Sequence, residues 1–62
     1  MLLELQALAK QIEGLTVRVS EHPSGKFNVM VGSKLEIKGE DGRYTEAFLR
    51  GMISRELNLL SE

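Results

Sequence analysis

The sequence predicts an α+β domain: a helix, three strands forming an antiparallel meander, and a second helix, with both helices packed on one face of the sheet. Apolar residues recur every three or four positions near both ends of the chain and every two positions between them. These spacings are the periods of helices and strands respectively. Short turn sequences containing glycine or proline separate the alternating stretches. The 62 residues are expected to form one domain, residues 1–62.

An amphipathic helix is predicted at the start of the chain. Its apolar stripe contains Met1, Leu5, Leu8, Ile12 and Leu15, and is widened by Leu2 and Ala9. Charged residues such as Glu4 and Lys10 lie outside the stripe, as in a helix with one buried side. Gly14 can adopt the left-handed conformation that ends a helix, so we expect the helix to end there.

Alternation of apolar and polar residues predicts three strands after Gly14. The residues expected to face the helices are Val17, Val19, Phe27, Val29, Val31, Leu35 and Ile37, with the first strand beginning at Leu15. His22-Pro23-Ser24-Gly25 is typical of a type I turn, with proline second and a glycine that allows positive φ. Gly32-Ser33 fits a two-residue type II′ turn, so consecutive strands should be antiparallel.

A second helix is predicted from about Arg43 to Leu60. Asp41 is one candidate for its N-cap and Thr45 is the other. Its apolar residues form two lines: Tyr44, Phe48, Met52 and Leu59 in one, and Leu49, Ile53, Leu57 and Leu60 in the other. The second line either faces the first helix or forms a seam between molecules. Gly51 costs a helix about 1 kcal/mol relative to alanine, which indicates either a close approach to another backbone or no structural role.

The composition limits how so small a domain can be stabilised. The chain has no cysteine and one histidine, so we expect no disulfide, no metal site and no bound cofactor. A domain of this size buries only about 60% of the surface of its unfolded chain. Association with another protein or with a second copy is therefore the expected supplement.

Charge and hydropathy argue against further classes of protein. The net charge of −1 argues against a protein dedicated to coating nucleic acid, although it does not exclude nucleic-acid binding. No stretch approaches the roughly 20 apolar residues of a membrane span, and Glu4 stands where a signal peptide carries positive charge. We therefore expect a cytoplasmic protein that does not bind membranes.

No recognisable catalytic set is present. A single histidine without a cysteine offers no triad, and the carboxylates of Glu21, Glu36, Glu40 and Asp41 are expected at exposed positions, where an acid is normally solvated. The glycines fit neither a P-loop nor a dinucleotide fingerprint. The sequence therefore predicts that the protein is not an enzyme.

Two surfaces are candidates for binding a partner. The first is the sheet face turned away from the helices. The residues expected to bind a partner there are Arg18, His22, Lys26, Lys34, Lys38 and Arg43, and Glu36 is expected on the same face. His22 itself is expected to be a partly exposed turn residue leaning on its hairpin. The second surface is the possible homodimer seam of Leu49, Ile53, Leu57 and Leu60.

The α-β-β-β-α order is similar to that of double-stranded RNA-binding domains, and His22-Pro23-Ser24-Gly25 falls where that family places a histidine-containing loop that reaches the RNA minor groove. Family members also carry a lysine-rich start to the second helix, which grips phosphates. Here that stretch, residues 42–47, contains one arginine and one glutamate and no lysine. The layout also resembles ribonuclease toxins of the HicA type, whose histidine stands in a glycine-serine-histidine context that this chain lacks.

These observations favour a noncatalytic protein-binding module that inhibits or modulates a larger protein or complex by covering a functional surface. Small proteins of this type are common in bacteriophages and mobile elements, and anti-CRISPR proteins and polymerase inhibitors are examples. The alternatives are a nucleic-acid-binding domain with the topology of double-stranded RNA-binding domains and a ribonuclease of the HicA type.

Overall fold

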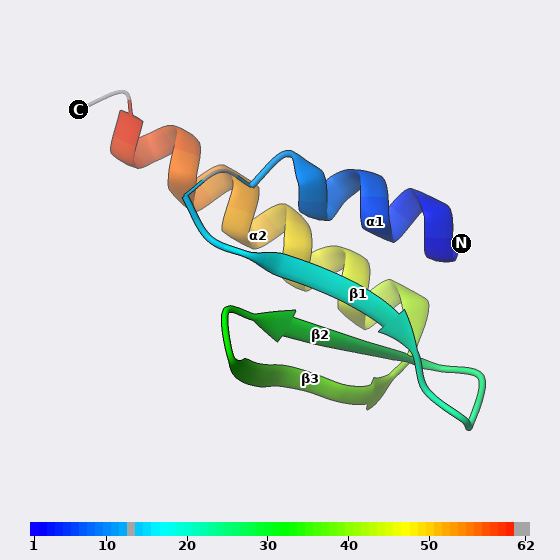
Figure 1. The fold of residues 1–62 in the computed structure, drawn as a ribbon. Helices are drawn as coiled ribbons and strands as arrows, with labels where there is room; N and C mark the ends of the chain where they lie inside the picture. The colour runs from blue at the N-terminus through cyan, green and yellow to red at the C-terminus, as the bar shows by residue number, and fades with distance from the viewer. Residues whose placement is uncertain (13, 61–62) are drawn as a thin grey trace.

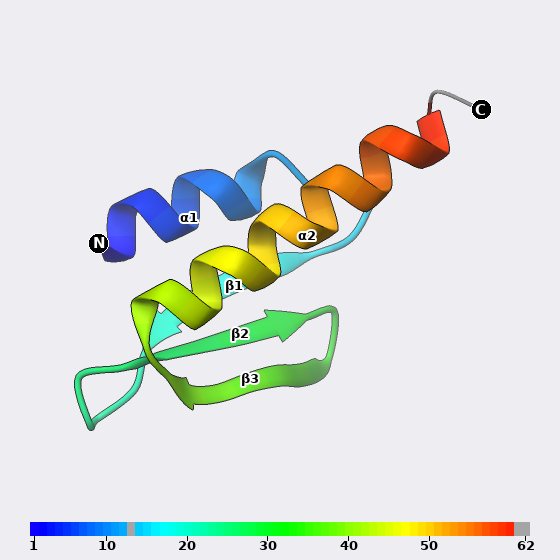
Figure 2. The ribbon, with the colours of Figure 1, turned by 180° about the vertical axis from the view of Figure 1, so that it is seen from behind.

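The computed structural model describes residues 1–12 and 14–60, with the backbone alone for 58–60. It contains α1 (Leu2–Lys10), β1 (Val17–Glu21), β2 (Phe27–Val31), β3 (Lys34–Glu40) and α2 (Gly42–Leu60). The strands form one antiparallel sheet in the order β1-β2-β3, and both helices lie on the same side of it (Figure 1 and, from behind, Figure 2). The predicted α-β-β-β-α meander is confirmed, and the other face of the sheet is open.

Helix α1 is shorter than predicted. It ends at Lys10, and the next two amides, those of Gln11 and Ile12, donate to carbonyls three residues earlier, each at 3.1 Å. This tightening closes the last turn before Gly14, which does have a positive φ of 81° but lies in the loop that follows. Leu15 is exposed and precedes β1, so the first strand begins two residues later than expected.

Asp41 is the residue that caps α2. Its carboxylate Oδ1 accepts a hydrogen bond of 2.7 Å from the amide of Tyr44, which has no partner within the first turn of the helix. Thr45, the competing candidate, is instead a buried residue inside the helix. Its hydroxyl donates to the carbonyl oxygen of Asp41 at 2.9 Å, so its one buried polar group is satisfied.

The core lies between the sheet and the two helices. Its buried apolar residues are Leu5, Ala9, Ile12, Val19, Phe27, Val29, Ile37 and Leu49, with Phe48, Met52 and Ile53 among the half-buried residues packed against them. Each of the five elements contributes at least one of these side chains. The alternation of β1 and β2 and the stripe of α1 therefore face the core as the sequence predicts.

Strand β3 departs from regular alternation at two places. Its partners on β2 are Val31 for Lys34, Met30 for Leu35, Val29 for Ile37 and Phe27 for Glu40. Glu36 is thus an extra residue between two pairs, and two residues of β3 face Asn28 alone. Each irregularity is a β-bulge, which shifts every side chain beyond it relative to the simple period of two.

Candidate binding face

The first bulge turns Leu35 away from the core. Residues directly opposite each other in antiparallel strands share one face of the sheet. Arg18 lies opposite Met30, and Met30 lies opposite Leu35, so the three side chains form one row across the open face. Leu35 is 44% exposed, whereas Ile37 on the helix side is 3% exposed. The expectation that Leu35 faces the helices is therefore wrong.

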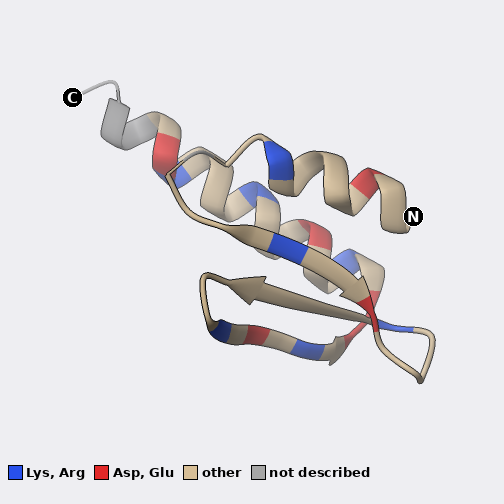
Figure 3. Cartoon of the chain, viewed as in Figure 1, with Lys and Arg blue, Asp and Glu red and all other residues tan. Residues whose placement is uncertain are grey.

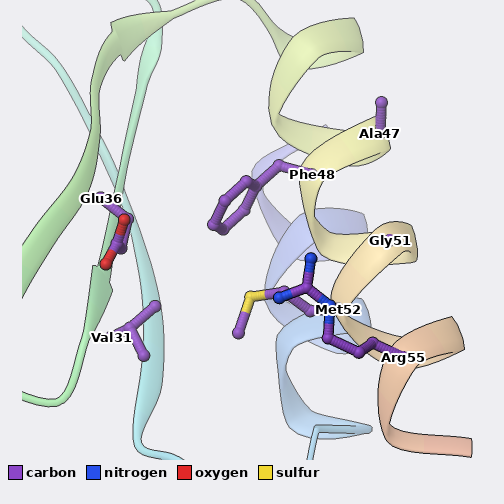
Figure 4. Close-up of a pocket in the computed structure, with 7 residues that line it drawn as sticks. All are labelled: Val31, Glu36, Ala47, Phe48, Gly51, Met52 and Arg55. Atoms are coloured by element: carbon purple, nitrogen blue, oxygen red, sulfur yellow. The ribbon is translucent and has the colours of Figure 1, made fainter.

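The same bulge moves Lys34 and Glu36 off the open face. Lys34 lies opposite Val31, which packs against the core, so it shares the helix side, and its Nζ lies 3.6 Å from Oε1 of Glu36. Glu36 lines a cavity of about 380 Å³ together with Phe48 and Met52 of α2. In Figure 4, Glu36 and Val31 stand on the strands opposite these α2 side chains. The predicted place of Lys34 and Glu36 on the open face is therefore wrong.

The acidic residues of the sheet all lie on the helix side. Glu21 lies opposite Phe27, and Phe27 lies opposite Glu40, which places both glutamates in the row of a core residue. Figure 3 shows charges of alternating sign along β3 and none on β2, and the bulge separates those of β3 between the two faces. Within strand segments 17–21, 27–31 and 34–40, the charged residues of the open face are Arg18 and Lys38.

The β1–β2 loop extends this face. The amide of Gly25 donates to the carbonyl of His22 at 2.9 Å, as the predicted type I turn requires, and the amide of His22 donates to the carbonyl of Lys26 at 2.8 Å. Nδ1 of His22 accepts a bond of 3.2 Å from the amide of Ser24 and lies 2.7 Å from its hydroxyl. Lys26 is exposed in the same loop and adds a third positive charge.

The His22 ring lies beside the second bulge. Gly39, in this bulge, has a φ of 66°, and a Cβ added to it would lie 3.4 Å from Nε2 of His22. Its amide donates to Oδ1 of Asn28 at 2.9 Å, which satisfies a group displaced from regular pairing. His22 is thus the half-exposed turn residue, leaning on its hairpin, that the sequence predicts.

Arg43 is separate from this surface. It is exposed in the first turn of α2, on the helix layer rather than on the strands. The open face is therefore defined by Arg18, Ser20, His22, Lys26, Asn28, Met30, Leu35 and Lys38. Of the six residues expected to bind a partner, four lie on it, and Leu35 is the member that sequence reasoning missed.

The predicted leucine seam is not one continuous surface. Leu49 is 0% exposed and belongs to the core, so its place in a seam is wrong. Ile53 also packs against the core, as expected if this line faces the rest of the molecule. Leu57 is 60% exposed, beside a shallow depression between the two helices that Leu8 also lines. The side chain of Leu60 lies outside the described part of the chain.

The surroundings of Gly51 are open, and metal-ligating side chains do not cluster among the described residues. A Cβ added to Gly51 would meet no described atom within 4 Å, so the chain makes no close backbone approach there. Among the described residues, no group of three or more His, Cys, Asp or Glu side chains could hold a metal ion. In the same part of the chain, no helix is long and apolar enough to cross a membrane.

Comparisons with known protein families, curated proteins and solved structures found no match.

Proposed function

We propose that this protein is a noncatalytic binding module whose open sheet face docks on an acidic surface of a larger protein. The observation that carries the proposal is the distribution of side chains on this face. The apolar pair Met30 and Leu35 lies beside Arg18, with Lys38 and Lys26 further out, and no strand carboxylate accompanies them. A protein with a net charge of −1 thus has one face of opposite sign.

This arrangement has the composition of a protein-protein interface. Such interfaces have an apolar centre, in which methionine and arginine are enriched, and a polar rim. Met30 and Leu35 supply the centre, while the hydroxyl of Ser20 and the amide of Asn28 supply polar groups close to it. The positive side chains would increase the association rate with an acidic surface and disfavour a basic one.

Nucleic acid is the less favoured ligand. Single strands bind proteins through aromatic side chains on which bases stack, and the open face has no Phe, Tyr or Trp. Phe27 and Phe48 pack in or against the core, and Tyr44 lies in the first turn of α2. At the start of α2, Asp41 precedes Arg43 and accepts a hydrogen bond as the helix cap. A carboxylate in that position repels the phosphates that double-stranded RNA-binding domains grip there.

The small size of the chain favours action by coverage. A standard interface buries about 800 Å² on each partner, roughly a sixth of the 4583 Å² accessible surface of this chain. The protein would therefore cover part of its partner with a preformed surface. Inhibition or modulation would follow because the covered part of the partner could no longer bind its other ligands.

The experiment is affinity recovery of partners from extracts of the cell of origin with three baits. The variant Arg18→Glu/Lys38→Glu reverses two charges of the open face, and Lys34→Glu/Arg43→Glu is the matched control because it reverses two charges that lie off this face. We expect the wild type and the control to retain an acidic protein that the double variant binds at least about tenfold more weakly.

Equal recovery by all three baits would contradict the proposal. Thermal unfolding of each bait is the control for folding, because exposed substitutions of this kind change stability by about 0.5 kcal/mol or less. A gel shift with RNA or DNA that disappears steeply with added salt, and that the double variant abolishes, would assign the face to nucleic acid instead.

A further inference from the structure

The outer edge of β1 has main-chain groups that the sheet does not use. The amide of Gly32 donates to Thr16, and the amide of His22 donates to Lys26, so the main chain of these even-numbered positions points toward β2. Successive residues of an antiparallel strand direct their main-chain N–H and C=O groups to opposite sides, so the amides and carbonyls of Val17, Val19 and Glu21 point away from the sheet. An edge of this kind is a template for another strand.

A groove lies along this edge, between β1 and α1. It has a volume of about 340 Å³ and is lined by Gln6, Ala9, Lys10, Val17, Arg18 and Val19. Figure 1 shows α1 running alongside β1, on the side away from β2. The lining combines apolar side chains with two exposed cations, Lys10 and Arg18. Neither cation forms an ion pair within residues 1–12 and 14–60.

Gln6 shows that the edge accepts a donor from the groove. Its Nε2 donates a hydrogen bond of 3.2 Å to the carbonyl oxygen of Val19, one of the outward-pointing groups. A side-chain amide thus occupies the position that the main-chain N–H of an added strand would take. Exchange of one donor for the other leaves Val19 satisfied, and the released Gln6 side chain can be hydrated.

A second copy of the chain fits this edge poorly. Adjacent strands are about 4.8 Å apart, while packed helices need about 8 to 10 Å between their axes. Symmetric pairing of two β1 edges would bring two α1 helices over the same pair of strands. An extended segment without a helix of its own avoids this conflict.

We propose that the β1 edge binds an extended, acidic peptide segment as a fourth strand in the groove beside α1. Main-chain hydrogen bonds to Val17 and Val19 provide the affinity of such strand addition, and side-chain contacts provide the specificity. Acidic side chains of the segment pair with Lys10 and Arg18, and its apolar side chains contact Ala9 and Val17. This site adjoins the open face, because Arg18 belongs to both, but its main-chain contacts to Val17 and Val19 do not depend on the docking proposed there.

The test uses a short extended peptide that carries glutamates on both faces of the strand around a central valine, and a matched peptide with lysine in place of each glutamate. Binding is measured by titration of the amide resonances of the labelled protein. We expect the glutamate peptide to shift the resonances of Val17 and Val19, and the lysine peptide to bind at least about tenfold more weakly. Lys10→Glu should remove most of this preference, because Arg18 then remains as the one cation that lines the groove, whereas Lys38→Glu, on the open face, should leave it unchanged.

Methylation of the peptide main chain separates strand addition from simple charge attraction. In a bound strand, the N–H groups of every second residue face β1 and the others face away from it. One peptide therefore carries N-methyl groups on its odd-numbered residues and a second carries them on its even-numbered residues. One of the two should lose binding and the other should retain it. Equal binding of both methylated peptides, or equal binding of the glutamate and lysine peptides, would overturn the proposal. Sedimentation of the free protein as a dimer that Lys10→Glu dissociates would assign the edge to a second copy and would also overturn it.

Discussion

The bulge in β3 determines which side chains form the open face, and paired truncations test it. Leu35 and Ile37 are both apolar and two residues apart, and simple alternation would bury both. In the structure Leu35 is 44% exposed and Ile37 is 3% exposed. Truncation of a fully buried leucine or isoleucine to alanine costs about 2 to 5 kcal/mol, because a cavity adds to the lost burial. A half-exposed leucine on an open face leaves no cavity, so Leu35→Ala should cost about 1 kcal/mol.

The measurement is the thermal midpoint of each variant by circular dichroism. For a domain of this size, 1 kcal/mol shifts Tm by about 4 to 8 °C. We therefore expect Leu35→Ala to remain folded with a shift in that range, and Ile37→Ala to lose several times as much stability or not to fold. Losses of equal size for the two variants would show that both side chains are buried and would refute the bulge. The assignment of charged side chains to the open face, which depends on the bulge, would then be wrong as well.

Three further substitutions test local features of the fold by the same measurement. Gly51→Ala should stabilise the protein by about 1 kcal/mol, because the added methyl meets no described atom and alanine is the better helix former; a loss would indicate an unseen contact. Asp41→Ala should destabilise it by about 1 kcal/mol through loss of the cap, and Asp41→Asn should retain most of the stability. Gly39→Ala should cost about 1 to 2 kcal/mol, since φ is 66°, a backbone conformation that alanine rarely adopts; an unchanged Tm would contradict this bulge geometry.

The order of elements could be predicted because local signals agree with the tertiary structure. The periods of α1 and β2, the Pro-Ser-Gly turn and the capping carboxylate of Asp41 each act within a few residues. They are therefore present in the sequence as spacing or residue type. The placement of His22 followed from its turn, for the same reason.

The face of Leu35 could not be predicted because no local signal marks the bulge. Residues 34–38 alternate between charged and apolar without interruption, which is the pattern of a regular strand. The extra residue, Glu36, becomes evident only when β3 is paired with β2. Gly39 is different, because a glycine within a strand is a recognised sign of an irregularity.

The prediction that Leu49 belongs to a homodimer seam was wrong for a different reason. Helical periodicity shows which residues share a line on the surface of a helix, but it does not show what covers that line. Leu49 is covered within the chain, whereas Leu57, two turns later, is exposed. Figure 2 shows that α2 continues past the end of the sheet, which explains why burial decreases along a single line.

The two proposed contacts have one chemical requirement in common. The open face and the groove beside α1 each present positive side chains with no carboxylate among the residues that define them, and Arg18 belongs to both, because it lies on the open face and also lines the groove. An acidic partner that used both would meet Lys38 at one end and Lys10 at the other. Net charge hides this property, since the balancing carboxylates of the sheet lie on the helix side. A partner should therefore approach from the strands, and reversal of Arg18 alone should weaken both contacts.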